Sequence, residues 1–253
     1  MRSAVAAFVA FAALGAAVAE AADAAASKPD FSGVWTVYRP PGAAPGPGRA
    51  ESAFPRDPPF TAEARQKVAE YRSLVEPLGL TPGGACVGYG MPSAMLSSGG
   101  YPMEWIQRPE QVTVIYEAHS EIRRIYIGNG PSEKDMIPSR DGTSLGRWEG
   151  NTLVVETVAL KEAVDQNSAH SDKAKIVERY TIGKDDAGRK VLTAEMTMTD
   201  PVFYTKPVSA TKRWLAVEGG RLLPYDCTEP QWEDQLDKLR QEQAAAKDKD
   251  ASK

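Results

Sequence analysis

Apolar and polar residues alternate along much of the chain after residue 102, which is the pattern of half-buried β-strands. The clearest case is Val191–Thr199, where leucine, alanine and methionine fill the even-numbered positions and threonine or glutamate fills most of the others. A second signal is Gly146–Thr157, in which Gly150-Asn151 separates an aromatic segment from a β-branched one and predicts a β-hairpin. We therefore expect a mainly β, antiparallel protein.

Nine segments carry enough apolar and β-branched residues to be predicted as strands. They are Phe31–Tyr38, Met103–Gln107, Val112–Ala118, Ile122–Ile127, Leu153–Val158, Ile176–Ile182, Val191–Thr199, Ser209–Val217 and Leu222–Cys227. Short turns link most of them, so the expected fold is an up-and-down meander closing into a single lipocalin-like β-barrel of about nine strands. A two-sheet sandwich is the alternative.

One or two helices are expected outside the barrel. In Thr61–Val75, Thr61 can cap the first turn and Ala64, Val68 and Tyr71 share one face, so this helix should cover a barrel end or an open edge. A second helix is predicted at Gln231–Gln243, docked on the outside by apolar residues at helical spacing. These residues are Trp232, Leu236 and Leu239.

The first residues have the character of a signal peptide. Met1-Arg2 is basic, Ala4–Val18 is apolar but too short for a comfortable membrane span, and Ala17-Val18-Ala19 is one small-x-small cleavage site. We predict a signal peptide at 1–21, a single barrel domain at 22–240 and a disordered charged tail at 241–253. The mature chain should be periplasmic or secreted and have no transmembrane segment; an uncleaved anchor is the alternative.

Export decides how the two cysteines are interpreted. Because an oxidising compartment favours pairing, Cys86 and Cys227 are predicted to form a disulfide, the alternative being two buried free thiols. Charge is balanced, with 30 Lys and Arg against 34 Asp and Glu, and no basic stripe interleaved with aromatics occurs. Nucleic acid is therefore not expected as a partner.

Metal and nucleotide motifs are missing from the sequence. It contains two histidines, no C-x-x-C, no H-E-x-x-H, no acidic calcium loop, no P-loop and no G-x-G-x-x-G. We expect neither a metal nor an organic cofactor. The oligomeric state is not indicated by the sequence.

The candidate acid–base residues lie near two long connections, 128–145 and 159–174. His170 can exchange protons near neutral pH, and Asp172 would orient it if the loop curls; the alternative is a surface histidine beside a turn. Glu178 shares strand parity with Ile176, so it should be interior, as an acid or base or in a structural ion pair with one of Arg123, Arg124 and Arg179. His119 is a weaker candidate and is more typical of a core or turn histidine.

A serine-hydrolase pattern is present but lacks its structural context. Gly142–Gly146 matches G-x-S-x-G, and Asp165 and His170 follow Ser144 in the order of α/β-hydrolases. That motif needs a strand before the serine and a helix after it, whereas here a hairpin follows. An ordinary turn is the preferred interpretation.

Substrate contacts are expected from one cation and a set of aromatic and sulfur-containing side chains. Arg124 would hold an anionic or phenolic group. Met103, Trp105, Trp148 and Tyr204 would line an apolar pocket, although the same residues suit ordinary core packing.

Motifs spread over most of the mature chain resemble a family of exported bacterial β-rich, lipocalin-like proteins. They are Phe31-Ser32-Gly33-Val34-Trp35, Cys86 with Gly90-Met91-Pro92, Arg123-Arg124-Ile125-Tyr126, Gly146-Arg147-Trp148-Glu149-Gly150, His170-Ser171-Asp172 with Glu178-Arg179, and Asp200-Pro201 with Tyr204-Thr205-Lys206-Pro207. The resemblance implies secretion and a β-rich fold but transfers no reaction. Members often carry histidine where this chain has Thr143.

These observations lead to an expected function and two rivals. The expected function is a cofactor-independent lyase, isomerase or hydrolase that moves protons on a small hydrophobic, aromatic molecule, with His170 as acid or base and Asp172 or Glu178 assisting. One rival is a non-catalytic periplasmic carrier that uses the same cavity. The other is an envelope interaction module without an enclosed cavity.

Overall fold

The computed structural model describes residues 28–42, 54–55, 57–97, 100–165, 168–228, 234, 236–238 and 240–241. The predicted signal peptide, nearly all of the predicted tail and most of the proline-rich segment before the first helix lie outside these residues. No helix in the described part is long and apolar enough to cross a membrane.

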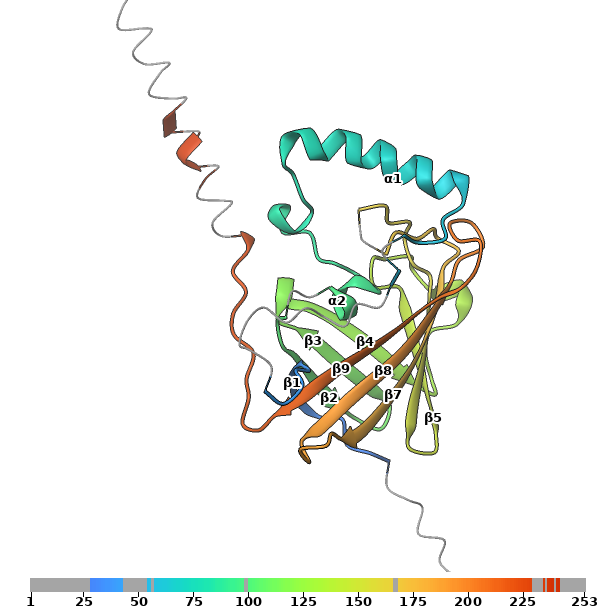
Figure 1. Ribbon diagram of the computed structural model, residues 1–253, viewed down its shortest axis with the longest axis vertical. Coiled ribbons are helices and arrows are strands. Elements are labelled where there is room, and N and C mark those ends of the chain that lie inside the picture. Colours follow the sequence, from blue (N-terminus) through green and yellow to red (C-terminus); the bar gives the residue numbers. More distant parts are fainter. Residues whose placement is uncertain are drawn as a thin grey trace, which may run out of the picture.

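Nine β-strands close into a barrel, and they follow one another around the ring in chain order (Figure 1). Their bounds are β1 Gly33–Val37, β2 Met103–Gln107, β3 Gln111–Tyr116, β4 Glu121–Ile127, β5 Thr143–Glu149, β6 Thr152–Val158, β7 Lys175–Lys184, β8 Lys190–Thr199 and β9 Val208–Val217. The predicted mainly β, lipocalin-like barrel is confirmed, and the sandwich is excluded.

One pair departs from the predicted antiparallel order. β4 and β5 run parallel, with Ile125 opposite Ser144. In a ring of nine strands, directions that alternate strictly cannot return to the starting direction, so at least one neighbouring pair must be parallel. The segment 128–142 carries the chain back along the barrel between these two strands, and β1 and β9 then close the ring as an antiparallel pair.

The strand predicted at Leu222–Cys227 is wrong. The chain there pairs with no strand, and Pro224 lacks the N–H that a strand ladder needs. In its place the barrel contains β5, which was not among the predicted strands. β5 is the first arm of the predicted hairpin, and it begins at Thr143, inside a segment predicted as a loop. Glu149 lies opposite Thr152, so the hairpin turn falls at Gly150-Asn151 as predicted. The other eight strands lie close to their predicted bounds.

The inside of the barrel is packed with large side chains. Trp35, Trp105 and Trp214 are each at most 2% exposed, and the Tyr180 ring meets Trp105 edge-on with centroids 4.9 Å apart. From Leu192 to Met198 the even-numbered residues of β8 are all buried, which confirms the predicted alternation. This interior is therefore a solid core, as in small barrels filled by their own side chains.

Helices gather at one end of the barrel. α1, Ala62–Val75, lies across this end (Figure 1), and its N-cap Thr61 accepts a hydrogen bond from the Ala64 amide at 3.2 Å. α2, Ser93–Leu96, is a single turn with all four residues buried in the barrel mouth. The described residues also form four 3₁₀ turns: η1 Glu76–Leu78, η2 Gly83–Ala85, η3 Ala118–Ser120 and η4 Glu133–Asp135.

Only part of the predicted C-terminal helix falls within the described residues. Positions 228, 234, 236–238, 240 and 241 are helical. Trp232 and Leu239, which were expected to dock this helix, lie outside them.

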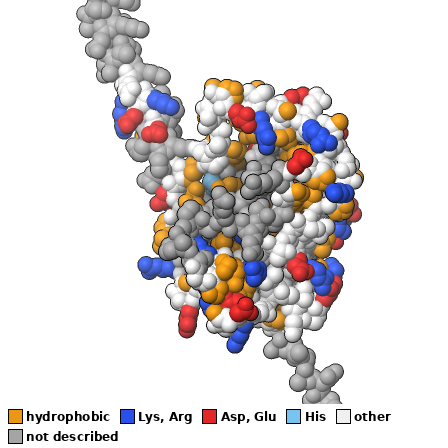
Figure 2. Space-filling view, in the orientation of Figure 1, with side chains coloured by type: hydrophobic (Ala, Val, Ile, Leu, Met, Phe, Trp, Pro, Cys, Tyr) orange, Lys and Arg blue, Asp and Glu red, His pale blue; other side chains and the backbone are white. Residues whose placement is uncertain are grey.

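Basic and acidic side chains are interspersed on the face of the molecule shown in Figure 2, with orange apolar atoms between them. This distribution agrees with the balanced composition.

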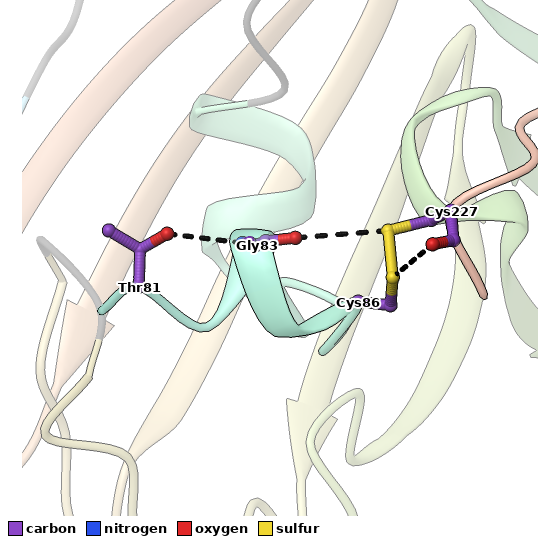
Figure 3. Close-up of a disulfide and its surroundings, with 5 residues drawn as sticks. Thr81, Gly83, Cys86 and Cys227 are labelled. Carbon is purple, nitrogen blue, oxygen red and sulfur yellow. Dashed lines mark hydrogen bonds between the residues drawn. A yellow bond between two sulfur atoms is a disulfide. The ribbon is translucent and has the colours of Figure 1, made fainter. Parts of the chain in front are cut away.

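Cys86 and Cys227 form the predicted disulfide (Figure 3), with Cα atoms 5.6 Å apart. The two cysteines are 141 residues apart in sequence. The bond joins the end of η2 to the segment after β9, so it ties the chain above the barrel mouth to the C-terminal side of the domain.

Replacing both cysteines, Cys86→Ala with Cys227→Ala, is expected to lower the free energy of unfolding by up to about 5 kcal/mol, because the unfolded chain regains the entropy of a very long loop. Denaturant titration of the oxidised and the double-variant protein measures the difference. The reduced wild type is the control and should match the variant. A loss below about 1 kcal/mol would show that the bridge does not constrain the unfolded chain.

Candidate functional site

A buried ion pair lies inside the barrel. Arg123 of β4 and Glu178 of β7 are 1% and 0% exposed, and the guanidinium binds both carboxylate oxygens. Arg123 also donates to Ser144 at 3.0 Å, to Thr157 at 2.8 Å and to Tyr180 at 3.3 Å. These contacts use the full donor capacity of a guanidinium.

The predicted interior position of Glu178 is thus correct, and its partner is Arg123 among the three arginines considered. Tyr180 donates a further hydrogen bond to Glu178 at 2.8 Å. Two N–H groups and one O–H therefore donate to this one carboxylate. This geometry matches the structural ion pair that was the alternative to catalysis.

Arg124, the residue expected to hold an anionic group, points the other way. It is exposed on the outer face of β4, because successive strand residues face opposite sides of a sheet. Met103 and Trp105 are each 2% exposed and belong to the packed core. Trp148 is half-buried, with its ring 5.6 Å from that of Phe31.

Ser144 of the G-x-S-x-G pattern is an interior strand residue. It is 1% exposed, and its hydroxyl lies 2.9 Å from that of Thr157 as well as receiving the Arg123 bond. Asp165 pairs with Arg140 at 2.9 Å, and His170 bonds the Ser168 backbone. Within the described residues no contact joins Ser144, Asp165 and His170, so they form no triad.

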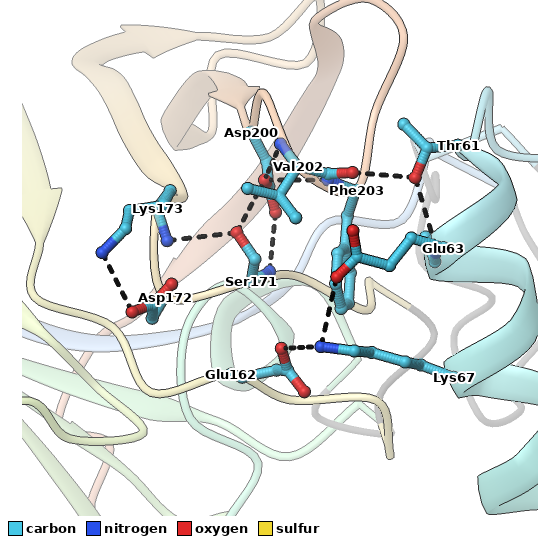
Figure 4. Close-up of polar contacts among 11 residues, drawn as sticks. Thr61, Glu63, Lys67, Glu162, Ser171, Asp172, Lys173, Asp200, Val202 and Phe203 are labelled. Carbon is cyan, nitrogen blue, oxygen red and sulfur yellow. Dashed lines mark hydrogen bonds and ion pairs between the residues drawn. The ribbon is translucent and has the colours of Figure 1, made fainter.

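His170 is buried, and its surroundings favour the uncharged imidazole. The side chain is 0% exposed, and Nδ1 lies 3.0 Å from the Ser168 carbonyl, which can only accept, so Nδ1 carries the proton. Burial lowers the pKa of His170, against the opposing effect of the Ser168 and Lys161 backbone. Asp172 does not orient the ring: it is exposed and pairs with Lys173 at 3.0 Å (Figure 4).

Asp200 is the organising residue of this region, and the sequence reasoning gave it no role. It accepts from the Ser171 amide and hydroxyl at 2.6 and 2.8 Å and from the Val202 and Phe203 amides at 3.0 Å (Figure 4). Tyr204, proposed for substrate contact, donates to the Ala169 carbonyl at 2.9 Å. The bonds from Ser171 to Asp200 and from Tyr204 to Ala169 therefore hold the 159–174 loop against the β8–β9 turn. An Asp-Pro turn signal was available in the sequence.

His119 packs between two tyrosine rings, edge-on to one and tilted to the other. Its backbone is left-handed, with φ at 61°, and its ring centroid is 4.8 Å from that of Tyr89 and 4.9 Å from that of Tyr225. Burial lowers the pKa of His119. No contact joins it to His170 or Glu178 in the described part of the chain, so the predicted acid–base residues do not converge.

Lys212 is a functional candidate that the sequence reasoning missed. It is 2% exposed on the inner face of β9, and its Nζ donates to the Leu96 carbonyl of α2 at 3.0 Å. Burial lowers the pKa of Lys212 to about 8. Strand parity carried the signal, because Ala210, Lys212 and Trp214 alternate on one face.

Two hollows lie at the barrel mouth. The larger, which we call the α1 hollow, has a volume of about 770 Å³ and lies between α1 and α2. Its apolar lining includes Phe54, Phe60, Val68, Ala69, Leu96 and Ala169. The smaller, the Tyr89 hollow, has a volume of about 200 Å³ and includes Tyr89, Arg140 and Asp165. Ser97 lines both, so the two hollows flank the end of α2.

Among the described residues, no group of three or more His, Cys, Asp and Glu side chains is placed to hold a metal ion. The arrangement that remains is a hollow with a mixed apolar and polar lining, above a sealed polar core. Such a hollow is suited to binding, and the acid–base groups named from the sequence do not line it.

Replacing Arg123 with methionine is expected to lower the free energy of unfolding by about 3–5 kcal/mol, because it leaves Glu178 as a buried carboxylate without its ion-pair partner. Arg124→Met is the matched control on the adjacent, exposed position and should change stability by less than about 0.5 kcal/mol. Urea unfolding of both variants measures this. Similar small losses in the two would contradict the role given to Arg123.

Comparison with protein-family models finds no match to this chain. Comparison with curated protein sequences also finds no relative. The functional assignment therefore depends on the geometry of the barrel mouth, and above all on the α1 hollow.

Proposed function

We propose that this chain is an exported carrier that binds a small, mostly apolar molecule with an anionic group in the α1 hollow. The observation that carries the proposal is the hollow itself, whose volume of about 770 Å³ lies in the range of small-molecule sites. The disulfide supports a place of action outside the reducing cytosol.

The apolar part of this mixed lining favours an apolar body for the ligand. Phe54 and Phe60 from the segment before α1, Val68 from α1 and Leu96 from α2 bring apolar surface from separate elements. Removing such surface from water on ligand binding contributes roughly 25 cal/mol for each Å² that is buried. The hollow needs no rearrangement of the filled barrel interior to accept a ligand.

Arg65 favours an anionic group on that ligand. It lines the hollow, is exposed, and takes part in no ion pair among the described residues. Arg72 also lines the hollow, but its Nε is 4.0 Å from a Glu76 carboxylate oxygen. A guanidinium presents paired N–H donors to carboxylate or sulfonate oxygens.

We propose a carrier in preference to a proton-transfer enzyme because of where the candidate acids and bases lie. His170 is sealed below the loop that lines the hollow, Asp172 faces solvent, and Glu178 is fully engaged with Arg123 and Tyr180. A general acid or base must reach its substrate within about one hydrogen bond.

The test uses anilinonaphthalene sulfonate, an apolar aromatic anion, and its uncharged analogue phenylnaphthylamine. Ala69→Trp fills the hollow and should weaken binding of both probes at least about tenfold, since it removes the space they occupy. Ala62→Trp, at the exposed start of the same helix and outside the lining, is the matched control.

Arg65→Gln should weaken binding of the anionic probe about three- to tenfold and leave the neutral probe unchanged, because it removes only the charge partner. Fluorescence titration measures both affinities, and mass spectrometry should recover the probes unaltered. Equal effects of Ala69→Trp and Ala62→Trp, or chemical conversion of a probe, would overturn the carrier proposal.

A further inference from the structure

Lys212 is a basic side chain inside the barrel that has no acidic partner among the described residues. It is 2% exposed, and it takes part in none of the ion pairs that those residues form. The buried Arg123, by contrast, is paired with Glu178. A lysine buried without a partner is costly, and a leucine or methionine would fill this inner position of β9 without that cost. Packing alone therefore does not explain the lysine.

The hydrogen bonds of Lys212 are incomplete as well. An ammonium group has three N–H donors. Nζ donates to the Leu96 carbonyl at 3.0 Å, and in the described part of the chain it makes no other hydrogen bond. The residue opposite on β8 is Ala194, whose side chain has no polar atom, and Trp214 offers only its ring, with the centroid 5.9 Å from Nζ. Two N–H groups of the ammonium are thus left without an acceptor.

The single acceptor of Lys212 belongs to the wall of the α1 hollow. Leu96 lines this hollow, and so does Ser97, the next residue. Leu96 is also the last residue of α2, which is a single helical turn. The amine is therefore one hydrogen bond away from a residue that a ligand in the hollow would touch. No other hydrogen bond of the lysine has to break for the amine to meet such a ligand.

A buried amine of this kind is suited to reaction with a carbonyl group. Burial lowers the pKa of Lys212 to about 8, so the free, nucleophilic amine is more abundant at neutral pH than it is for an exposed lysine. Condensation with an aldehyde or ketone forms an imine, which carries a single N–H when it is protonated. One N–H matches the one acceptor that the Leu96 carbonyl provides, whereas an ammonium leaves two N–H groups unpaired.

An anionic group is a poorer occupant for this position than a neutral carbonyl group. Arg65 and Arg72 already present guanidinium groups on the α1 side of the hollow. An anion bonded to Lys212 would have to lose its water beside Ala194 and Trp214, in the apolar core. An aldehyde or ketone enters such surroundings at a much smaller desolvation cost, because it has no charge to desolvate.

We propose that Lys212 is a covalent attachment site, which binds the aldehyde or ketone group of a molecule held in the α1 hollow as an imine. The inference rests on the proposed function, because the hollow must hold the molecule first. The Nζ lone pair attacks the carbonyl carbon, and a C=N bond forms. Both N–H protons of the amine end on the carbonyl oxygen, which leaves as water. A proton from solvent then gives the imine its N–H. Hydrolysis reverses these steps and releases the ligand unchanged.

The test incubates the full chain with naphthalene-2-carbaldehyde and sodium cyanoborohydride, whose hydride reduces the imine to a stable secondary amine. Peptide mass spectrometry measures the rate at which Lys212 gains a naphthylmethyl group, with the exposed Lys134 and Lys206 as internal references. At about pH 7.5 the rate at Lys212 should exceed either reference by on the order of tenfold or more, because more of it is free amine. A rate at or below that of the references would overturn the attachment site.

Two variants of α1 show whether the hollow supplies the aldehyde. Ala69→Trp fills the hollow and should slow the labelling of Lys212 at least about fivefold while leaving Lys134 unchanged. Ala62→Trp, outside the lining, is the matched control and should keep the wild-type rate. Equal labelling of Lys212 in these two variants would refute the assignment of the carbonyl group to a ligand of the hollow.

Non-covalent binding separates this inference from the carrier proposal. Lys212→Met removes the amine and should leave the affinity for phenylnaphthylamine within about twofold of the wild type, since that probe has no carbonyl group. If phenylnaphthylamine binds in the hollow but Lys212 is labelled no faster than Lys134, the attachment site is wrong and the carrier proposal stands. If phenylnaphthylamine does not bind, the carrier proposal fails and the attachment site fails with it. Should Lys212→Met not fold, the wild type and Ala69→Trp still decide the question.

Discussion

Arg123 is a charge sealed inside the barrel, and the arrangement of the polar core depends on how it is satisfied. Its guanidinium reaches β5, β6 and β7 from β4, so one side chain links four neighbouring strands through hydrogen bonds. These bonds span the β4–β5 pair, the one place where the ring is parallel. Since a buried cation without its partners is very costly, registers that move Ser144, Thr157 or Glu178 away from Arg123 are disfavoured.

Because side chains fill the barrel interior, a ligand site is expected at an end of the barrel. The tryptophans and the ion-pair network fill the middle of the barrel. The segment 88–97, which we call the plug, closes the mouth, and Lys212 donates to the Leu96 carbonyl there. Of the two hollows described at the mouth, the larger lies between α1 and the plug. The barrel therefore serves as a rigid base, while the segments between β1 and β2 form the surface on which a small molecule can be held.

Charged groups from β4 and from the connection before β5 face residues 88–90. Glu121, Asp141 and Arg140 all lie at the ends of β4 and β5, where the parallel pair leaves a long connection above the mouth. A parallel neighbour needs such a crossover, and this one places charged residues next to the plug backbone. The closing requirement of a nine-stranded ring thus determines where the charged groups of the mouth are found.

The sequence by itself determined eight of the nine strands, the hairpin turn, the capped helix, the disulfide and the interior position of Glu178. These follow from local properties: period-two alternation, Gly-Asn turn chemistry, an N-cap threonine and cysteine in an exported chain. Only the tertiary structure decided that β4 and β5 are parallel, that Glu178 pairs with Arg123 while Arg124 faces solvent, and that His170 and Asp172 point apart. Strand direction, partner choice and loop curvature depend on contacts between residues far apart in the chain, and no local pattern encodes those distances.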